Sequence, residues 1–254
     1  MIEITDIRKS FGDKHAVDGI SFTVAEGEIM GFLGPNGAGK STTLNIITGY
    51  LSADSGVVKI DGTDILSDPI KAKKDIGFLP EIPPLYPEMT VAEYLDFVYE
   101  LKGCKLPRKQ HIKEICEVVK IWDVSGRLIK NLSKGYKQRV GIAQALIGNP
   151  KVLIFDEPTI GLDPRQIIEI RNLIKMLGKE HTIILSTHIL PEVQAVCDRI
   201  VVINKGRIVA NEKTEDLINA VDGSRKLVAK IVGQEEEVLK ALRALPGVKT
   251  ADII

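Results

Sequence analysis

The feature that most constrains the fold is the glycine-rich stretch "GPNGAGKST" at residues 34–42, which lies between the apolar run "EIMGFL" and the segment "TLNIITGY". A strand, a loop of this pattern and a helix, in that order, form a phosphate-binding unit of an α/β protein. Gly37 and Gly39 let backbone N–H groups turn toward an anion, and the helix presents its positive N-terminal end to the same anion. The stretch therefore predicts a phosphate site at the start of the first helix.

Within this loop, each residue type has a chemical reason to be there. Lys40 is expected to reach the β- and γ-phosphates of a nucleotide, and the Ser41 hydroxyl is expected to ligate Mg²⁺. The alternative is a glycine-rich turn with an incidental lysine, which the strand and helix on either side disfavour. The nucleotide-binding residues predicted here are Gly34, Pro35, Asn36, Gly37, Ala38, Gly39, Lys40, Ser41 and Thr42.

A pair of carboxylates follows a second apolar run, in "KVLIFDEPTIGLDP" at residues 151–164. Val152 to Phe155 is continuously apolar between two prolines, which is typical of a buried strand of a parallel sheet. Such strands end at the ligand crevice, so Asp156 is expected to help hold Mg²⁺ and Glu157 to orient and deprotonate an attacking water. The alternative, which would apply if the phosphate loop were absent, is that both carboxylates are solvent-exposed residues of a loop.

A third strand, "TIILST" at residues 182–187, is followed by His188. A histidine at the end of a strand beside a terminal phosphate can donate a hydrogen bond to it, although a lone histidine there is otherwise a surface or packing residue. We therefore assign a catalytic role to His188. His15, His111 and His181 follow no such strand and receive no role.

Composition excludes several other classes of protein. The chain of 254 residues is 44% hydrophobic and 27% charged, which is too apolar for a disordered protein, and its 34 basic and 34 acidic residues give no charge excess for nucleic acid. Three cysteines without CxxC spacing favour neither a disulfide framework nor a zinc site. Neither a signal peptide nor an apolar run near ~18 residues is visible, so we expect a cytoplasmic protein that reaches a membrane only through a partner.

The first half of the chain divides into two kinds of segment. In residues 1–30 and 56–65 the side chains alternate in character and many are β-branched, which is typical of strands. Asp61-Gly62 is typical of a hairpin turn, so we expect an antiparallel sheet. Residues 88–147 have helical periodicity and begin with a capping box made by Thr90 and Glu93. The apolar stripe expected to face the core of this helical region consists of Val91, Leu95, Val98 and Leu101.

The second half returns to strands at 152–155, 182–187 and 200–204 and then loses its motifs beyond about residue 210. The tail reads as strand, helix and strand, in "KLVAKIV", "QEEEVLKALRALPG" and "VKTADII", with an apolar helix face of Val238, Leu239, Leu242 and Leu245. We expect a domain over 1–210 and a β-α-β extension over 211–254. That extension has too little core to fold alone, so it packs on its own body, pairs with a partner, or begins a longer domain.

The motifs "GPNGAGKST", "LSKGYKQRV", "VLIFDEP", "GLDP" and "STH" occur in the order seen in ATP-binding cassette (ABC) ATPases, which this chain resembles over residues 1 to about 210. The resemblance implies a P-loop NTPase fold with a parallel core sheet, an N-terminal antiparallel β subdomain and an inserted helical subdomain. It also implies ATP and Mg²⁺ as ligands. The expected partners are a second copy of the chain or a homologous ATPase subunit, and an integral membrane permease that holds the chain at the inner face of the membrane, with no nucleic acid.

In that family two domains dimerise head to tail, and the signature loop of one subunit caps the ATP bound to the other. Ser133 and Gly135 match this loop, where a hydroxyl, an open backbone and a helix N-terminus make a second anion site. Phe11 matches the aromatic that stacks on adenine, and Val17 is expected beside the base, the alternative being ordinary strand residues. Asp163 matches the loop that links the two sites, the alternative being a turn aspartate before proline.

Two departures from the family pattern bear on function. The signature loop has Lys134 and Tyr136 where the family has glycine and glutamine, and Glu81 stands where the family has a glutamine that contacts Mg²⁺ and the attacking water. Glu81 either adds a carboxylate to the metal site or points to solvent. The surrounding stretch "LPEIPPLYPEMTVAEYLDFVYELKG" is similar to ATPases of ABC-2-type exporters, including the gliding-motility and drug-resistance branch.

These observations leave three functional hypotheses. The first is an ATPase whose dimer closes on two Mg-ATP, opens after hydrolysis and drives a separate permease, with Glu157 as base and Lys40 stabilising charge. The second is a regulatory ATP-binding switch with little turnover, which Glu81 keeps open. The third is an ABC ATPase acting on ribosomes or DNA, although such proteins resemble tandem cassettes or carry a long coiled-coil insertion, and neither is seen in this sequence.

Overall fold

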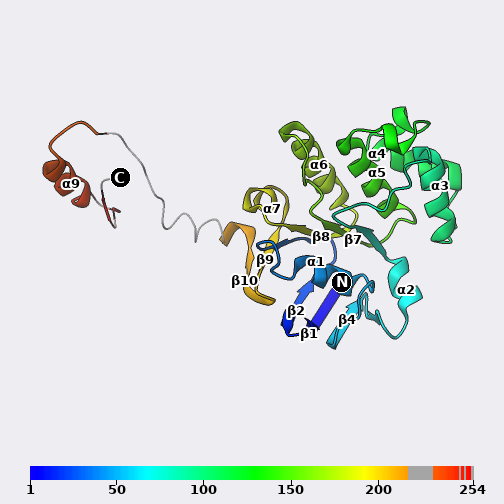
Figure 1. The fold of residues 1–254 in the computed structure, drawn as a ribbon, viewed down its shortest axis with the longest axis horizontal. Helices are drawn as coiled ribbons and strands as arrows, with labels where there is room; N and C mark the ends of the chain where they lie inside the picture. The colour runs from blue at the N-terminus through cyan, green and yellow to red at the C-terminus, as the bar shows by residue number, and fades with distance from the viewer. Residues whose placement is uncertain (217–230, 246, 249, 253–254) are drawn as a thin grey trace. The chain divides into compact units, whose positions relative to one another are not determined.

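The computed structural model describes residues 1–216, 231–245, 247–248 and 250–252. The chain separates into two units, Met1–Ile218 and Asn219–Ile254, which are treated individually. Figure 1 gives the course of the chain, whose elements in order are β1 (Ile2–Phe11), β2 (Lys14–Val24), β3 (Ile29–Leu33), α1 (Lys40–Ile47), β4 (Ser55–Ile60), β5 (Thr63–Asp64), α2 (Pro69–Lys74), β6 (Ile76–Leu79), α3 (Val91–Leu101), α4 (Arg108–Val118), the 3₁₀ helices η1 (Trp122–Val124) and η2 (Ile129–Asn131), α5 (Lys134–Leu146), β7 (Val152–Asp156), α6 (Pro164–Leu177), β8 (Thr182–Thr187), α7 (Leu190–Val196), β9 (Arg199–Asn204), β10 (Arg207–Lys213) and α9 (Glu235–Arg243).

The first sheet is antiparallel, with the strand order β2-β1-β4-β5. Its last hairpin pairs Ile60 with Thr63, which leaves Asp61 and Gly62 as the two loop residues. Both loop residues have positive φ, 50° and 75°, as a tight type I′ turn requires. The antiparallel sheet and its Asp61-Gly62 turn are thus confirmed.

The second sheet has the order β10-β9-β3-β8-β7-β6, and all its neighbours are parallel except β10 with β9. The strands predicted at 152–155, 182–187 and 200–204 are present as β7, β8 and β9. Every residue of β7 and β8 is buried, because helices cover both faces of a parallel sheet. The carboxyl ends of β3, β7 and β8 lie at one edge, so the loops that follow them meet there.

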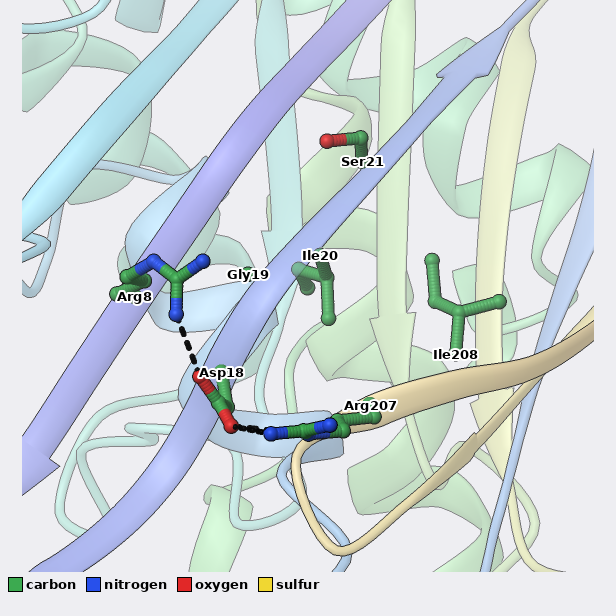
Figure 2. A pocket seen from close by; sticks show the side chains of 7 residues that line it. All are labelled: Arg8, Asp18, Gly19, Ile20, Ser21, Arg207 and Ile208. Atoms are coloured by element: carbon green, nitrogen blue, oxygen red, sulfur yellow. Dashed lines mark hydrogen bonds and ion pairs between the residues drawn. The ribbon is translucent and has the colours of Figure 1, made fainter.

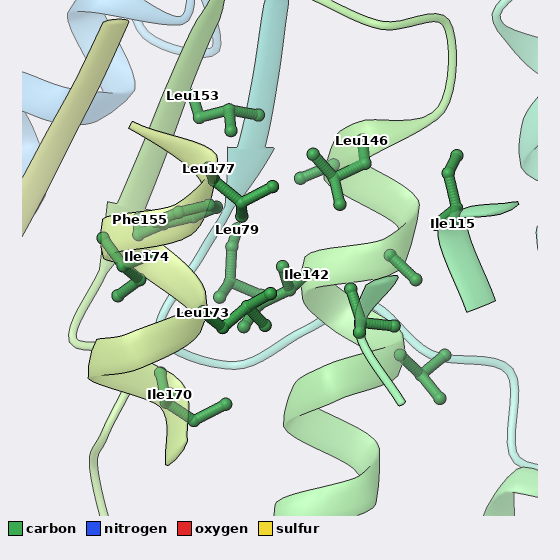
Figure 3. Packing of buried hydrophobic residues seen from close by; sticks show 14 of the residues in the cluster. Leu79, Ile115, Ile142, Leu146, Leu153, Phe155, Ile170, Leu173, Ile174 and Leu177 are labelled. Atoms are coloured by element: carbon green, nitrogen blue, oxygen red, sulfur yellow. The ribbon is translucent and has the colours of Figure 1, made fainter. Parts of the chain in front are cut away.

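Two apolar clusters cover opposite faces of this parallel sheet. Side chains alternate along β7, so that Val152 and Ile154 belong to the cluster around α1 while Leu153 and Phe155 belong to the cluster around α5 and α6. Figure 3 shows the second cluster, in which the strand residues meet helix residues that include Ile142, Leu146, Leu173, Ile174 and Leu177. The rigid sheet between these two layers supports the loops at its edge.

The helical region contains α3, α4 and α5, which lie together in Figure 1. The capping box that opens α3 is confirmed, because Thr90 Oγ1 accepts from Glu93 N–H and the Glu93 carboxylate accepts from Thr90 N–H. Val91, Leu95 and Val98 are buried as predicted. The prediction for Leu101 was wrong, because this side chain sits at the last position of α3 and is 74% exposed.

In the C-terminal unit, the predicted helix is present as α9, but it ends at Arg243 and so leaves out Leu245 of the predicted apolar face. Its first turn carries Glu235, Glu236 and Glu237 and its last turn carries Lys240 and Arg243, which places each charge at the favourable end of the helix dipole. Residues 226–230 of the first predicted strand lie outside the described residues, and 231–232 are not in a strand. The second strand, predicted for 248–254, is absent at residues 248 and 250–252, which are the described part of that segment.

None of the helices in the described ranges is both long and apolar enough to span a bilayer.

Candidate active site

A pocket of about 350 Å³ opens where the loops after β3, β7 and β8 meet. It joins the phosphate loop, the carboxylate at the end of β7, the histidine after β8 and the N-terminal sheet. The residues that line it are Phe11, Lys14, Ala16, Asn36, Gly37, Gly39, Lys40, Ser41, Thr42, Glu81, Glu157, Ile160 and His188.

The phosphate loop is held in place by close backbone packing. Gly39 caps α1 with a φ of 111°, and a Cβ at this position would lie 2.4 Å from the Ala16 carbonyl oxygen on β2. A Cβ on Gly34 would likewise lie 2.3 Å from the Ile203 carbonyl oxygen on β9. Gly37, with a φ of 77°, has no atom within 4 Å of such a Cβ. Two of the glycines are therefore required by neighbouring strands, whereas Gly37 leaves its backbone open on the pocket side.

Lys40 is buried in the loop with its ammonium group turned back over the turn. Its Nζ donates to the carbonyl oxygens of Gly34 at 2.8 Å and Pro35 at 3.3 Å. The same Nζ lies 3.5 Å from a Glu157 carboxylate oxygen, and both side chains are less than one-tenth exposed. A buried cation and a buried carboxylate thus face each other at the floor of the pocket, where water screens their charges weakly.

Glu157 is fixed between the ends of two strands. Its backbone has a φ of 49°, and its N–H donates to the Ser186 carbonyl oxygen at 3.0 Å. His188 Nδ1 lies 3.0 Å from both Glu157 carboxylate oxygens. The positive φ of a bulky residue is sparsely populated and is retained here at the point where the carboxylate enters the pocket. The His188 side chain is 38% exposed, so it forms part of the accessible wall.

The donor set fits a hard divalent cation. Asp156 Oδ1 is buried at the end of β7 and, within the described residues, has no hydrogen-bond partner, and the same is true of the Ser186 hydroxyl. These two residues are register partners on adjacent parallel strands. Buried oxygens without partners suit a metal ion or its water shell; Ser41 and Glu81 line the pocket, whereas Asp156 does not, and the described residues contain no cluster of three His, Cys, Asp or Glu side chains placed to hold a metal. Ser186 belongs to the "STH" motif but was assigned no role, because its position beside Asp156 is set by the pairing of β7 with β8.

Of the two residues expected beside the adenine, Phe11 and Val17, only Phe11 lines the pocket. Phe11 is 53% exposed and lines the pocket, consistent with a stacking surface. Val17 is 1% exposed and belongs to the core beneath the sheet, so the expectation that it packs beside the base is wrong. Side chains alternate along a strand, and the pocket wall on β2 is formed instead by Lys14 and Ala16.

Ser133, Gly135 and Asp163 lie away from this pocket, at the N-termini of two helices. Ser133 caps α5 by accepting from Tyr136 N–H at 3.4 Å, and Asp163 caps α6 by accepting from two N–H groups at 3.0 Å. Gly135 packs against the side chain of Gln166, since a Cβ there would lie 2.6 Å from its amide nitrogen. The two helix N-termini are therefore neighbours and form a surface separate from the phosphate loop.

A second cavity, of about 460 Å³, lies where β1 and β2 approach β10 (Figure 2). Asp18 accepts from Arg8 NH1 at 2.6 Å and from Arg207 Nε at 2.9 Å, and the Arg207 hydrogen bond holds the pKa of Asp18 below its usual value. These exposed ion pairs connect the two sheets and give this cavity a structural explanation.

Comparisons with known proteins identify a family and a fold that the chain shares. The sequence profile described as "ABC transporter" matches residues 17–160. The chain is 36% identical over 255 residues to the linearmycin resistance ATP-binding protein LnrL of Bacillus subtilis, covering 100% of this chain and 82% of that protein. It is 36% identical to the Nod factor export ATP-binding protein I of Rhizobium etli, covering 95% of this chain and 76% of that protein. A solved dimeric ATP-binding cassette, MJ0796, in a post-hydrolysis state with ADP and Pi superposes with a TM-score of 0.77 at 28% identity, covering 84% of this chain and 99% of that one.

Proposed function

The chain belongs to the ABC transporter family, as an ATP-binding subunit and ATPase, and from that premise we propose that its pocket is one half of a hydrolytic site that a second subunit completes. The observation that carries the proposal is the meeting of Lys40, Glu157 and His188 in one pocket from three separate segments of the chain. A base, a cation and a hydrogen-bond donor beside a phosphate loop are the groups that phosphoryl transfer to water requires.

In the proposed reaction, Glu157 accepts the proton of the water that attacks the terminal phosphate of ATP. His188, when both ring nitrogens carry a proton, donates from Nδ1 to Glu157 and from Nε2 to the phosphate. Lys40 neutralises charge that develops on the leaving and transferring phosphates. Mg²⁺, when bound, would supply electrophilic stabilisation of the phosphate oxygens, with Ser41 and Asp156 as its holders and Glu81 as an additional carboxylate at the pocket wall.

The adenine is proposed to stack on Phe11, and the signature surface to serve a second subunit. Ser133 and Gly135 do not line the pocket of their own chain, so a nucleotide in that pocket reaches such a surface only on another copy. Asp163, at the neighbouring helix N-terminus, is placed to contact the same subunit. The supporting fact from comparison is that the similar cassette MJ0796 is a dimer.

The cassette is further proposed to power export through a separate membrane permease at the inner face of the cell membrane. Support comes from relatives named for linearmycin resistance and for Nod factor export. Glu81, which kept the switch hypothesis open, lines the same pocket, but the presence there of the base, the lysine and the histidine favours turnover.

The test is steady-state Mg-ATP hydrolysis over a range of protein concentrations. We expect specific activity to rise with concentration, Glu157→Gln to abolish turnover while retaining nucleotide binding, and Ser133→Ala to lower turnover. The matched control is Ser52→Ala, which removes the hydroxyl of an exposed serine away from the site. Turnover that is independent of concentration and insensitive to Ser133→Ala would rule out the shared site.

A further inference from the structure

We propose that Glu192, a buried carboxylate that does not line the pocket, is a positioning residue that holds Glu157 and His188 in the geometry needed for hydrolysis. This inference rests on the proposed roles of those two residues. Glu192 lies on α7 and is 2% exposed. None of the five sequence motifs includes it.

Glu192 binds two threonine hydroxyls that are far apart in sequence. Both carboxylate oxygens lie 2.8 Å from Thr159 Oγ1, and one of them also accepts from Thr187 Oγ1 at 2.8 Å. Both threonines are themselves buried. Charge-assisted hydrogen bonds of this kind are stronger than neutral ones and are not weakened by water when the group is buried.

Each threonine is within two residues of a proposed catalytic group in the sequence. Thr159 is two residues after Glu157, within the turn in which Ile160 N–H donates to the Glu157 carbonyl oxygen at 3.2 Å. Thr187 directly precedes His188, and its Oγ1 also accepts from Ile189 N–H at 3.2 Å. One carboxylate therefore joins the Glu157 turn to the His188 loop from the side of the sheet that α7 covers, while the two catalytic side chains meet on the pocket side.

A third element reaches the same carboxylate. Arg171 on α6 lies 3.8 Å from Glu192 Oε1 and is the cation that balances its buried charge. The Arg171 Nε is also buried and, in the part of the chain that the structure describes, has no hydrogen-bond partner. Because α6 begins directly after Asp163, the cluster connects both catalytic loops to the helix whose N-terminus faces the second subunit in the proposed dimer.

The chemistry of this cluster argues against a role in packing alone. Burying a carboxylate is unfavourable even when it is paired, and apolar side chains of similar volume would fill the same space at lower cost. What the ionised group provides is direction, since its oxygens accept from both threonines at once. Displacements of about 1 Å at a reacting centre lower rates about 100-fold, so fixing both loops to one carboxylate has a direct consequence for turnover.

The test compares Thr159→Val and Thr187→Val, which keep the volume and remove the hydroxyl, with Thr159→Ser and Thr187→Ser, which keep the hydroxyl. We expect each valine variant to lower kcat at least tenfold with KM for ATP changed less than twofold, and the serine variants to restore most of the activity. The matched control is Thr182→Val, at the opposite end of β8, where a buried hydroxyl accepts from Gly27 N–H. This control should lower Tm by a similar amount and leave kcat unchanged.

Equal losses of Tm and kcat in all three valine variants, or unchanged kcat in Thr159→Val and Thr187→Val, would overturn the inference. Glu157→Gln, measured alongside, separates it from the function on which it rests. If Glu157→Gln abolishes turnover and the threonine variants do not alter it, the catalytic assignment stands and the positioning role fails. If Glu157→Gln remains active, the catalytic assignment itself fails.

Discussion

Gly39→Ala tests the claim that β2 holds the phosphate loop in place. The added Cβ would lie 2.4 Å from the Ala16 carbonyl oxygen, about 1 Å closer than an ordinary carbon–oxygen contact, so the loop or the strand must move by about that amount. The φ of 111° adds backbone strain of about 1–3 kcal/mol, and the overpacking adds about 1–3 kcal/mol. The expected loss of unfolding free energy is the sum, about 2–6 kcal/mol, together with a displaced phosphate site.

Gly27→Ala is the matched comparison, because Gly27 also has a positive φ, 74°, but has no atom within 4 Å of its Cβ position. We expect it to lower the unfolding free energy by about 1–2 kcal/mol and to leave nucleotide binding unchanged. Urea unfolding and ATP titration of both variants measure the two effects. The reasoning is refuted if Gly39→Ala binds ATP as tightly as the unaltered chain and is no less stable than Gly27→Ala.

Three further outcomes are expected. Phe11→Ala should weaken ATP binding by about 1–3 kcal/mol in a fluorescence titration without lowering Tm, because the ring is half exposed; an unchanged affinity would contradict stacking. Asp163→Ala should lower the unfolding free energy by about 1 kcal/mol, seen as a lower urea midpoint, because it removes the α6 cap. Asp163→Asn keeps a capping oxygen and should largely preserve the stability of the unaltered chain. Burial lowers the pKa of Lys102 from 10.5 to about 8, so between these pH values the unfolded chain holds more protons and stability rises with pH. The unfolding free energy of the unaltered chain minus that of Lys102→Met should therefore rise between pH 8 and pH 10.5 and stay constant below pH 7. A difference that is constant over the whole pH range would contradict the lowered pKa.

Local sequence was sufficient wherever the cause of a structure is local. The Asp61-Gly62 hairpin depends on two residues that tolerate positive φ, and the Thr90 cap depends on a glutamate three residues away. The continuous apolar runs identified β7 and β8 because strands of a parallel sheet are buried on both faces. The phosphate loop and the residues at the strand ends followed from the same patterns.

Two expectations about which way a side chain faces were wrong, one taken from the family resemblance and one from helical periodicity. Val17 was expected at the base and lies in the core, because one step along a strand reverses the side chain and the bulges in the pairing of β1 with β2 are not visible in the sequence. Leu101 continued the apolar stripe of α3 but is the last residue of the helix and is exposed.

Residues within a few positions of one another account for the phosphate loop, the strands that deliver Glu157 and His188, and the Thr90 cap of α3, so these features could be predicted before the fold was known. Three other features depend on residues distant in sequence and are visible only in the fold: Gly39 is required by a carbonyl on β2, Asp156 and Ser186 are adjacent, and Glu192 binds threonines from two loops. Thr159 and Glu192 are 33 positions apart, and no spacing rule connects them. Their hydrogen bond exists because α6 and α7 pack together against the sheet that contains β7 and β8, which brings a buried carboxylate and its partners within 2.8 Å.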